Sequence, residues 1–334
     1  MTRAGASTPG GFRGASRLIT VLSVGTLIVG LFAATAWGAP QRRTPRPAAQ
    51  AAGTTRQRVM QAPVVTGALA AVNAYRVGVG VGRVAEDPAL SAGDAAAAAC
   101  LLASGQLGDL HALQPALCPA GVDVASAATA AARSLVLSPD APADPARAVE
   151  RFETAPFHAL ALALPSLSRI GFGAASTPDG SRGAALIDVT SGMGGTSAAA
   201  RPLLVSPPLG WTVPGSTARG AEWPDPLAGC PLVGAAAGPA LWVATGQVAS
   251  APALGRPQLQ RHVGSRWITA PASWCTVTAD TYDGGSTDAT SRGRLWLQAM
   301  GADVLFPTAP LPPGTWRVVV RASGHRVDIG FRVG

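Results

Sequence analysis

The chain has 334 residues, of which 48% are hydrophobic and 13% are charged. This length is enough for about two domains with buried cores, and 40 glycines with 29 prolines indicate many turns. All 26 basic residues are arginine, and the net charge is +8. Nucleic-acid binding would require arginines gathered on one folded face, and their only dense run lies in a spacer-like stretch, which argues against that class.

Residues 18–37 form a segment of 20 residues without a charge, preceded by Arg3, Arg13 and Arg17. As a helix this segment rises about 30 Å, the thickness of a bilayer core. One interpretation of residues 1–38 is a secretory signal peptide, because Ala34 and Ala36 frame an A-x-A cleavage site. The other is a retained membrane anchor with the arginines on the inner side. Both predict that the rest of the chain is extracellular or lies in the cell envelope.

Residues 39–61 are rich in Pro, Ala and Gln, and this composition predicts a disordered linker. The alternative is electrostatic contact with an anionic membrane or wall polymer. The arginines of this stretch are Arg42, Arg43, Arg46, Arg56 and Arg58.

Residues 62–165 are rich in alanine and carry the start and stop signals of helices. Asp87 and Asp144 each precede a proline, and an Asp-Pro pair begins a helix because Asp caps the first turn and Pro fits its first position. Gly105 ends the first of these helices, and Pro156 stops the second. The predicted helices cover residues 67–75, 87–104, 123–135 and 144–155.

Two strands are predicted at residues 170–173 and 184–189, with a turn at 177–182 between them. Residues 62–195 are therefore predicted to be an α+β domain. The Gly-rich stretch "GVGVGRV" (78–84) lacks G-x-G-x-x-G and has no flanking strand, so it is interpreted as a connector between helices.

Beyond residue 203, short strands alternate with Gly/Pro turns, which predicts a β-sandwich over residues 202–334. The last strand, 326–333, alternates apolar and polar residues, and the turn at Ser323-Gly324 joins it to a strand at 316–321 as a hairpin. Further strands are predicted at 241–245, 294–298 and 303–306. His262 and His325 are expected in exposed loops or turns.

Four cysteines in an exported chain indicate disulfides, and four allow three pairings. Their spacing favours Cys100 with Cys118 and Cys230 with Cys275, one bridge in each half. A zinc site is the alternative, but the chain has no C-x-x-C and no His at ligand spacing from a Cys.

Three segments of the first half resemble the CAP superfamily (cysteine-rich secretory proteins, antigen 5 and pathogenesis-related proteins). "LAAVNAYR" (69–76) is similar to its L-x-x-x-N-x-x-R helix, and "EDPALSAGDAAAAA" (86–99) to its D-P-x-L-x-x-x-A helix. The strongest match is "AVERFETAPFHALALALPSLSRIGFG" (148–173). The resemblance implies an α-β-α sandwich.

The resemblance also implies a cavity with His111, in "LHAL" (110–113), and His158 as ligand-binding candidates. Glu153 is the only nearby acid on the matching helix, because the family's Gly-Glu-Asn-Ile motif is replaced by "GVDVASAATAAARSL" (121–135). Two His and one carboxylate can hold zinc but lack the usual fourth partner. The alternative is that both His are helix-end residues satisfied by backbone carbonyls, and that Glu153 is solvated.

The second half resembles the Ig-like domain that follows CAP domains in some bacterial secreted proteins. "EWPDPLAGCP" (222–231) and "ADVLFPTAPLPPGTWRVVV" (302–320) carry this match, and the two resemblances together cover about residues 66–334. In this group Cys230 and Cys275 would staple the sandwich. The tryptophans of this half are expected in the core, with an exposed glycan-binding strip as the alternative: Trp242, Trp267, Trp274, Trp296 and Trp316.

Nucleophilic catalysis is poorly supported, because the chain has neither G-x-S-x-G nor H-E-x-x-H. We therefore expect a non-catalytic module of the cell envelope without a cofactor. The resemblance implies a small ligand, such as the lipids and sterols bound by some CAP members, or an envelope partner. The alternative is a divalent-metal-dependent hydrolase that uses zinc on the cavity histidines. No nucleic-acid partner is expected, and a membrane contacts the chain through residues 18–37 if they are uncleaved.

Overall fold

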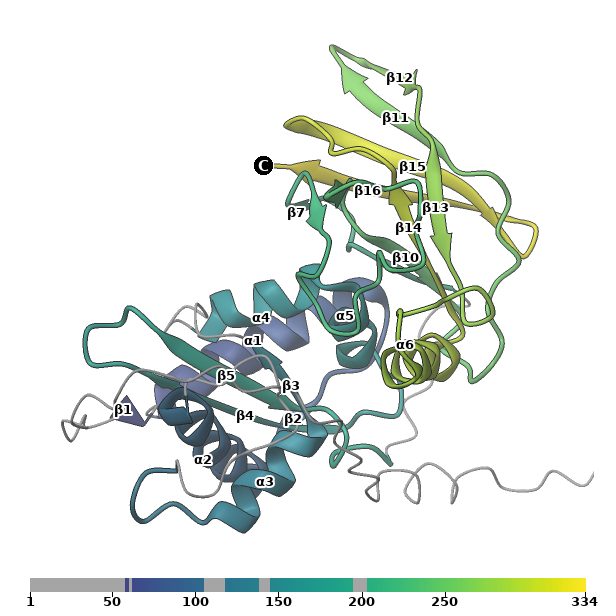
Figure 1. The fold of residues 1–334 in the computed structure, drawn as a ribbon. Helices are drawn as coiled ribbons and strands as arrows, with labels where there is room; N and C mark the ends of the chain where they lie inside the picture. The colour runs from purple at the N-terminus through teal and green to yellow at the C-terminus, as the bar shows by residue number, and fades with distance from the viewer. Residues whose placement is uncertain (1–57, 60–61, 105–117, 138–144, 195–202) are drawn as a thin grey trace, which may run out of the picture. The chain divides into compact units, whose positions relative to one another are not determined.

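The computed structural model describes residues 58–59, 62–104, 118–137, 145–194 and 203–334 (Figure 1). The segment at 1–38, nearly all of the predicted linker, and His111 lie outside these residues. Among the residues that are described, no helix has the length and apolarity needed to cross a bilayer. The described residues belong to one compact unit.

The first half, residues 62–194, contains the helices that the sequence predicts. Asp87 accepts a hydrogen bond from the Ala89 amide at the start of the second helix, and Asp123 caps the third by accepting from Ala125 and Ser126. Pro156 ends one helix and occupies the first position of the next. The helices are α1 (Ala62–Val79), α2 (Pro88–Ser104), α3 (Val124–Arg133), α4 (Pro145–Thr154) and α5 (Pro156–Leu162).

A sheet lies between these helices, with α2 and α3 on one face and α1 and α4 on the other (Figure 1). The predicted strands and turn at 170–189 form its antiparallel centre, and every residue of β5 is buried because both faces are covered. The strand order is β1-β4-β5-β3, and β2 runs parallel to β4. The strands are β1 (Arg58–Val59), β2 (Ala85–Glu86), β3 (Ser134–Leu137), β4 (Arg169–Ser176) and β5 (Gly183–Asp188).

Two glycines of β4 let helix α2 lie directly against the strand. Gly171 and Gly173 are two residues apart and therefore face the same side of the sheet. A Cβ on Gly171 would lie 2.6 Å from the carbonyl carbon of Leu90, and a Cβ on Gly173 would overlap the backbone of Asp94 and Ala95. The Gly-x-Gly pattern of this strand thus sets the distance between helix and sheet.

Asn73 and Arg76 of α1 have structural roles. The Asn73 side chain donates to the Val84 carbonyl and accepts from the Val84 amide, which fixes the connector before α2. Arg76 is fully buried, and burial lowers its pKa to about 10. It carries no carboxylate partner in the described residues and instead donates to backbone carbonyls of two connectors: Gly82, Leu162, Leu164 and Leu167.

The second half, residues 203–334, contains two sheets packed face to face. One, the β14 sheet, has the order β13-β14-β10-β6, and the other, the β15 sheet, has the order β12-β11-β15-β16-β7. Residues from both sheets form one hydrophobic cluster, as expected for a sandwich. The strands are β6 (Leu204–Ser206), β7 (Trp211–Val213), β8 (Thr217–Ala218), β9 (Ala236–Ala237), β10 (Leu241–Ala244), β11 (Gln258–Val263), β12 (Arg266–Ala270), β13 (Trp274–Val277), β14 (Ala302–Pro307), β15 (Gly314–Ala322) and β16 (His325–Val333).

The predicted C-terminal hairpin is confirmed. Strands β15 and β16 pair antiparallel around Ser323 and Gly324, whose φ angles are 48° and 83°. A two-residue turn with both φ positive matches the twist of the flanking strands, which is why Gly is favoured there. The α+β class predicted for the chain is confirmed as well.

The predicted strand at 294–298 is wrong, because these residues lie in helix α6 (Thr287–Met300). Ser286 caps the helix by accepting from the Ala289 amide, and Gly301 ends it in the left-handed conformation. The buried residues Gly293, Leu297 and Met300 are spaced four and three apart, which is helical spacing. Leu295 and Leu297 alternate as they would in a strand, but the helix caps Ser286 and Gly301 lie outside this short stretch.

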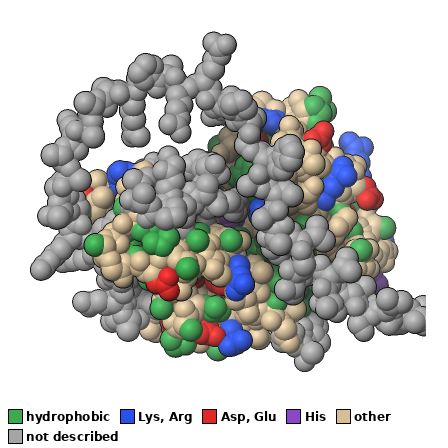
Figure 2. Space-filling model, turned by 60° about the horizontal axis from the view of Figure 1, so that its bottom comes forward, with side chains coloured by type: hydrophobic (Ala, Val, Ile, Leu, Met, Phe, Trp, Pro, Cys, Tyr) green, Lys and Arg blue, Asp and Glu red, His purple; other side chains and the backbone are tan. Residues whose placement is uncertain are grey.

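One hydrophobic cluster contains residues of both halves. Phe157 of α5 packs edge-on against Tyr282 with ring centroids 5.2 Å apart, and Tyr75 of α1 lies 5.7 Å from Trp211. The division into domains at 62–195 and 202–334 stays a prediction. On the face shown in Figure 2, charged side chains occur in small groups between larger areas of uncharged surface, as expected when 13% of residues are charged.

Candidate functional site

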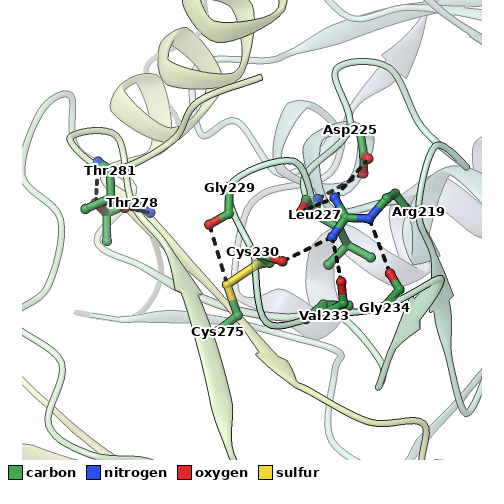
Figure 3. The surroundings of a disulfide bond; sticks show 10 residues. All are labelled: Arg219, Asp225, Leu227, Gly229, Cys230, Val233, Gly234, Cys275, Thr278 and Thr281. Carbon is green, nitrogen blue, oxygen red and sulfur yellow. Dashed lines mark hydrogen bonds and ion pairs between the residues drawn. A yellow bond between two sulfur atoms is a disulfide. The ribbon is translucent and has the colours of Figure 1, made fainter. Parts of the chain in front are cut away.

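Both predicted disulfides are confirmed: Cys100 pairs with Cys118, and Cys230 pairs with Cys275. The second bridge joins strand β13 to the segment between β8 and β9, residues 219–235, which we call the disulfide loop (Figure 3). A bridge of this kind restricts the unfolded chain and holds the loop against the β14 sheet.

Arg219 organises the interior of the disulfide loop, where its guanidinium is surrounded by carbonyl groups (Figure 3). A second contact is with the Asp225 carboxylate at 3.9 Å. The guanidinium fork presents several donors in fixed directions, so one side chain can hold several turns of backbone. The carbonyls that accept from Arg219 are those of Leu227, Cys230, Val233 and Gly234.

Tyr282 and the loop residue Asp225 also hold the disulfide loop in place. The Tyr282 hydroxyl donates to the Asp225 carbonyl at 3.0 Å, and the Asp225 carboxylate accepts from the Leu227 amide at 2.9 Å. Burial, and the nearby Asp225 and Glu222, raise the pKa of Tyr282. The loop is therefore fixed by a disulfide, an arginine and a tyrosine, and this framework positions Glu222.

Glu222 reaches from the disulfide loop to helix α5 of the first half. Its Oε1 accepts a hydrogen bond from the His158 backbone amide at 2.7 Å and lies 2.5 Å from His158 Nδ1. Pro156 begins this helix, so His158 lies in its first turn, where the amides have no acceptor within the helix. The Glu222 side chain is 3% exposed, and its Oε2 is buried without a hydrogen bond in the structure.

This contact defines the chemistry of the His158 ring. Because an ionised carboxylate only accepts hydrogen bonds, the 2.5 Å contact assigns a proton to Nδ1, and Nε2 is then an acceptor whenever the ring carries no second proton. The ring packs 5.3 Å from Phe152 and is 13% exposed. Nε2 forms no hydrogen bond with the residues that are described. The pair therefore presents one oriented, partly accessible nitrogen, suited to a ligand hydroxyl or a metal ion.

Glu153, near the end of α4, is half-buried, and its Oε1 is shielded from solvent without a hydrogen-bond partner among the described residues. Burial, together with the nearby Glu150, raises its pKa to about 8. The nearby Tyr75 hydroxyl donates to Ser206 Oγ at 3.2 Å, and burial raises the pKa of Tyr75 strongly. At neutral pH Glu153 is therefore mainly protonated and uncharged.

The three predicted site residues thus have different outcomes. His158 lies at a polar contact between the halves, with a carboxylate partner in place of the expected backbone carbonyl. Glu153 is half-buried, and among the described residues it forms no hydrogen bond with His158. His111 lies outside the described residues. Within the described ranges, no group of three or more His, Cys, Asp or Glu side chains can hold a metal.

Sequence reasoning missed Glu222, although it stands inside "EWPDPLAGCP". Glu222 precedes the disulfide cysteine Cys230 by a few residues, which indicates that it lies in a constrained loop. This position does not indicate which residue it contacts. His262 and His325 are exposed as predicted, but they lie in strands β11 and β16. Trp242 and Trp316 are buried, as the core interpretation predicts.

In comparisons with family models, curated proteins and solved structures, none matched this chain.

Arg219→Ala is expected to lower the free energy of unfolding by about 2 kcal/mol, because it removes charged hydrogen bonds to several loop carbonyls. Hydrogen exchange should increase in residues 219–235 more than elsewhere. Arg83→Ala removes an equal charge from an exposed position and is the control. Unchanged exchange in the loop of the Arg219 variant would contradict the assigned role.

Proposed function

We propose that this chain is an exported, non-catalytic ligand-binding module, in which a CAP-like domain is followed by an Ig-like domain. The observation that supports this proposal is the contact between His158 and Glu222. It leaves His158 Nε2 as an oriented acceptor, held by a loop that is itself fixed by a disulfide. The ligand is a small molecule with a hydrogen-bond donor and an apolar body, or an envelope component of that chemistry.

The CAP-like assignment is supported by the roles of the motif residues. Asn73 and Arg76 fix connectors, and Gly171 and Gly173 allow α2 to approach β4, so two of the three quoted segments contain residues with a specific structural purpose. The layered arrangement of helices around a sheet is in keeping with this assignment. The Ig-like assignment is supported by the disulfide at Cys230 and by two packed sheets, whose strand pairs are antiparallel apart from β7 with β16.

Two features support a role without catalysis. Glu153 is mainly protonated at neutral pH, so it is a poor general base and a poor anionic metal ligand. Among the described residues no cysteine is free, so no thiol nucleophile is present there. The pair of His158 and Glu222 therefore orients a ligand, and the described residues offer no thiol nucleophile for this pair to activate.

A divalent-metal-dependent hydrolase is the second candidate, favoured by one specific observation. A carboxylate that fixes the Nδ1 proton of a His, and so turns Nε2 outward, is the usual outer partner of a metal-ligating His. His158 would bind zinc through Nε2, and His111 is the second ligand that the sequence offers.

One experiment separates the two candidates. The purified full chain is titrated with a fluorescent fatty acid and a fluorescent sterol, and its zinc content is measured by mass spectrometry. The binding module predicts saturable probe binding without stoichiometric zinc, and about tenfold weaker binding by His158→Ala and Glu222→Gln. His262→Ala and Glu150→Gln, both at exposed positions, are the matched controls. Stoichiometric zinc that is lost in His158→Ala would replace the binding module with the hydrolase.

A further inference from the structure

The outer face of the β15 sheet is polar and basic. The apolar residues Trp316, Val318 and Val320 of β15 are buried in the sandwich, so the alternate residues point outward. The strand register places Gln260 opposite Arg317, Gln258 opposite Val319, and Arg321 opposite Arg326. Residues directly opposite in an antiparallel pair share a face, and the outward side chains therefore form one continuous surface. It contains Gln258, Gln260, His262, Trp267, Thr269, Thr315, Arg317, Arg321, Arg326, Asp328 and Arg332.

This surface has an excess of positive charge that its own acid does not balance. The Asp328 carboxylate accepts hydrogen bonds from Nε and Nη2 of Arg326 at 2.9 and 3.1 Å. One of its oxygens also lies 4.0 Å from Nη1 of Arg317. Among the described residues, Arg321 donates to the Gly324 carbonyl alone, at 3.3 Å. Arg332 forms no hydrogen bond or ion pair with the residues that the structure describes. The arginines thus offer donors for an anionic partner.

Arg317 is held in place before any partner arrives. Its Nε donates to the Gln260 side-chain oxygen at 2.7 Å, and its guanidinium lies 4.4 Å from the centre of the Trp267 ring. His262 packs against the same ring with centroids 5.0 Å apart. A guanidinium fixed by an amide and an aromatic ring loses little freedom on binding, which favours recognition of a planar anion.

Two shallow pockets lie beside this surface and share Arg256 and Gln258. The first, of about 240 Å³, is also lined by Arg321 and Arg326, and the second, of about 280 Å³, by Thr269 and Trp274. Arg256 is exposed and forms no hydrogen bond or ion pair with the described residues. Each pocket therefore combines a cation with an amide, and the second adds an indole ring.

We infer that the outer face of the β15 sheet binds an anionic polysaccharide. Arginine forks bind the carboxylate groups of such a polymer in pairs of hydrogen bonds. Gln and Thr side chains pair with sugar hydroxyls, and Trp274, which lines the second pocket, offers apolar ring surface for a sugar face. The extended, nearly acid-free surface suits a repeating ligand better than a single small anion. This site is separate from the His158 site and does not depend on it.

The test measures binding of the full chain to polygalacturonate at low and at physiological salt. Binding is expected to be saturable, to weaken with salt, and to be absent for neutral dextran. Arg321→Ala/Arg332→Ala should weaken it about tenfold or more, because both charged donors are lost. The matched control, Arg83→Ala/Arg182→Ala, removes the same charge from exposed positions of the first half. Thermal unfolding verifies that each variant folds.

Three outcomes would overturn the inference. The first is no binding of polygalacturonate by the unmodified chain. The second is an equal loss of binding in the control double variant, since the positive charge would then act without a defined site. The third is equally tight binding of polyglutamate, which carries carboxylates without sugar rings. The fatty-acid and sterol titrations report on the His158 site alone, so the two proposals fail independently.

Discussion

Gly173→Ala is expected to lower the free energy of unfolding by about 3 kcal/mol or more, a large part of the roughly 5–15 kcal/mol that stabilises a typical domain. The reason is that an added methyl would overlap the backbone of Asp94 and Ala95 in α2, and backbone cannot turn aside as a side chain can. Relief requires the whole helix to move off the strand. Chemical denaturation of the full chain, followed by circular dichroism, measures the effect.

Gly67→Ala is the matched control for this prediction. Gly67 lies in α1 and has open space around it, so the added methyl meets nothing. Because glycine is a poor helix former, this variant should be as stable as the unmodified chain or more stable by about 0.5–1 kcal/mol. Equal stability of the two alanine variants would contradict the close approach of α2 to β4.

Glu153→Gln is expected to raise stability at pH 8 by about 3 kcal/mol and to leave it nearly unchanged at pH 4. Burial raises the pKa of Glu153 from 4.5 to about 8 in the folded chain. Below pH 4.5 both folded and unfolded chains are protonated at this residue. As pH rises, the unfolded chain loses this proton first, so stability falls until pH passes about 8. Glutamine keeps the shape of the protonated acid but cannot ionise.

The measurement is the unfolding midpoint in urea at a series of pH values from 4 to 9. The difference between variant and unmodified chain should grow across the interval from pH 4.5 to 8. Burial raises the pKa values of Asp94 and Asp303 to about 7 and about 6. These two residues therefore also lower the free energy of unfolding as pH rises, equally in the Glu153 variant and in the unmodified chain. Asp288→Asn, which removes an exposed acid from α6, is the control. A pH-independent difference would show that Glu153 is charged in the folded chain.

Local signals in the sequence predicted much of the fold. The Asp-Pro pair at Asp87 marks the start of α2, and its effect lies within one turn of chain. The hairpin at Ser323-Gly324 is similarly local, because the turn residues and the alternation on both sides agree. The disulfide pairing followed from spacing, since each bridge closes the shorter available loop.

The candidate site was harder to predict, because it depends on contacts between distant parts of the chain. His158 and Glu222 are 64 residues apart, and no periodicity links a helix start with a loop residue. Nothing local in the sequence distinguishes Glu153 from an exposed acid, because its partial burial depends on how α4 packs against α1, which carries Tyr75. Helix α6 was missed because a short alternation within it resembles a strand when its Ser and Gly caps are ignored.

The hydrophobic cluster shared by the two halves has a consequence for protein engineering. Cutting the chain at residues 195–202 would expose Phe157 on one product and Tyr282 on the other, and would leave His158 without its carboxylate. Each product would expose an apolar surface that is buried in the intact chain. The halves are therefore poor candidates for separate production or exchange with other proteins, and co-expression of the two pieces should recover more soluble material than either piece alone.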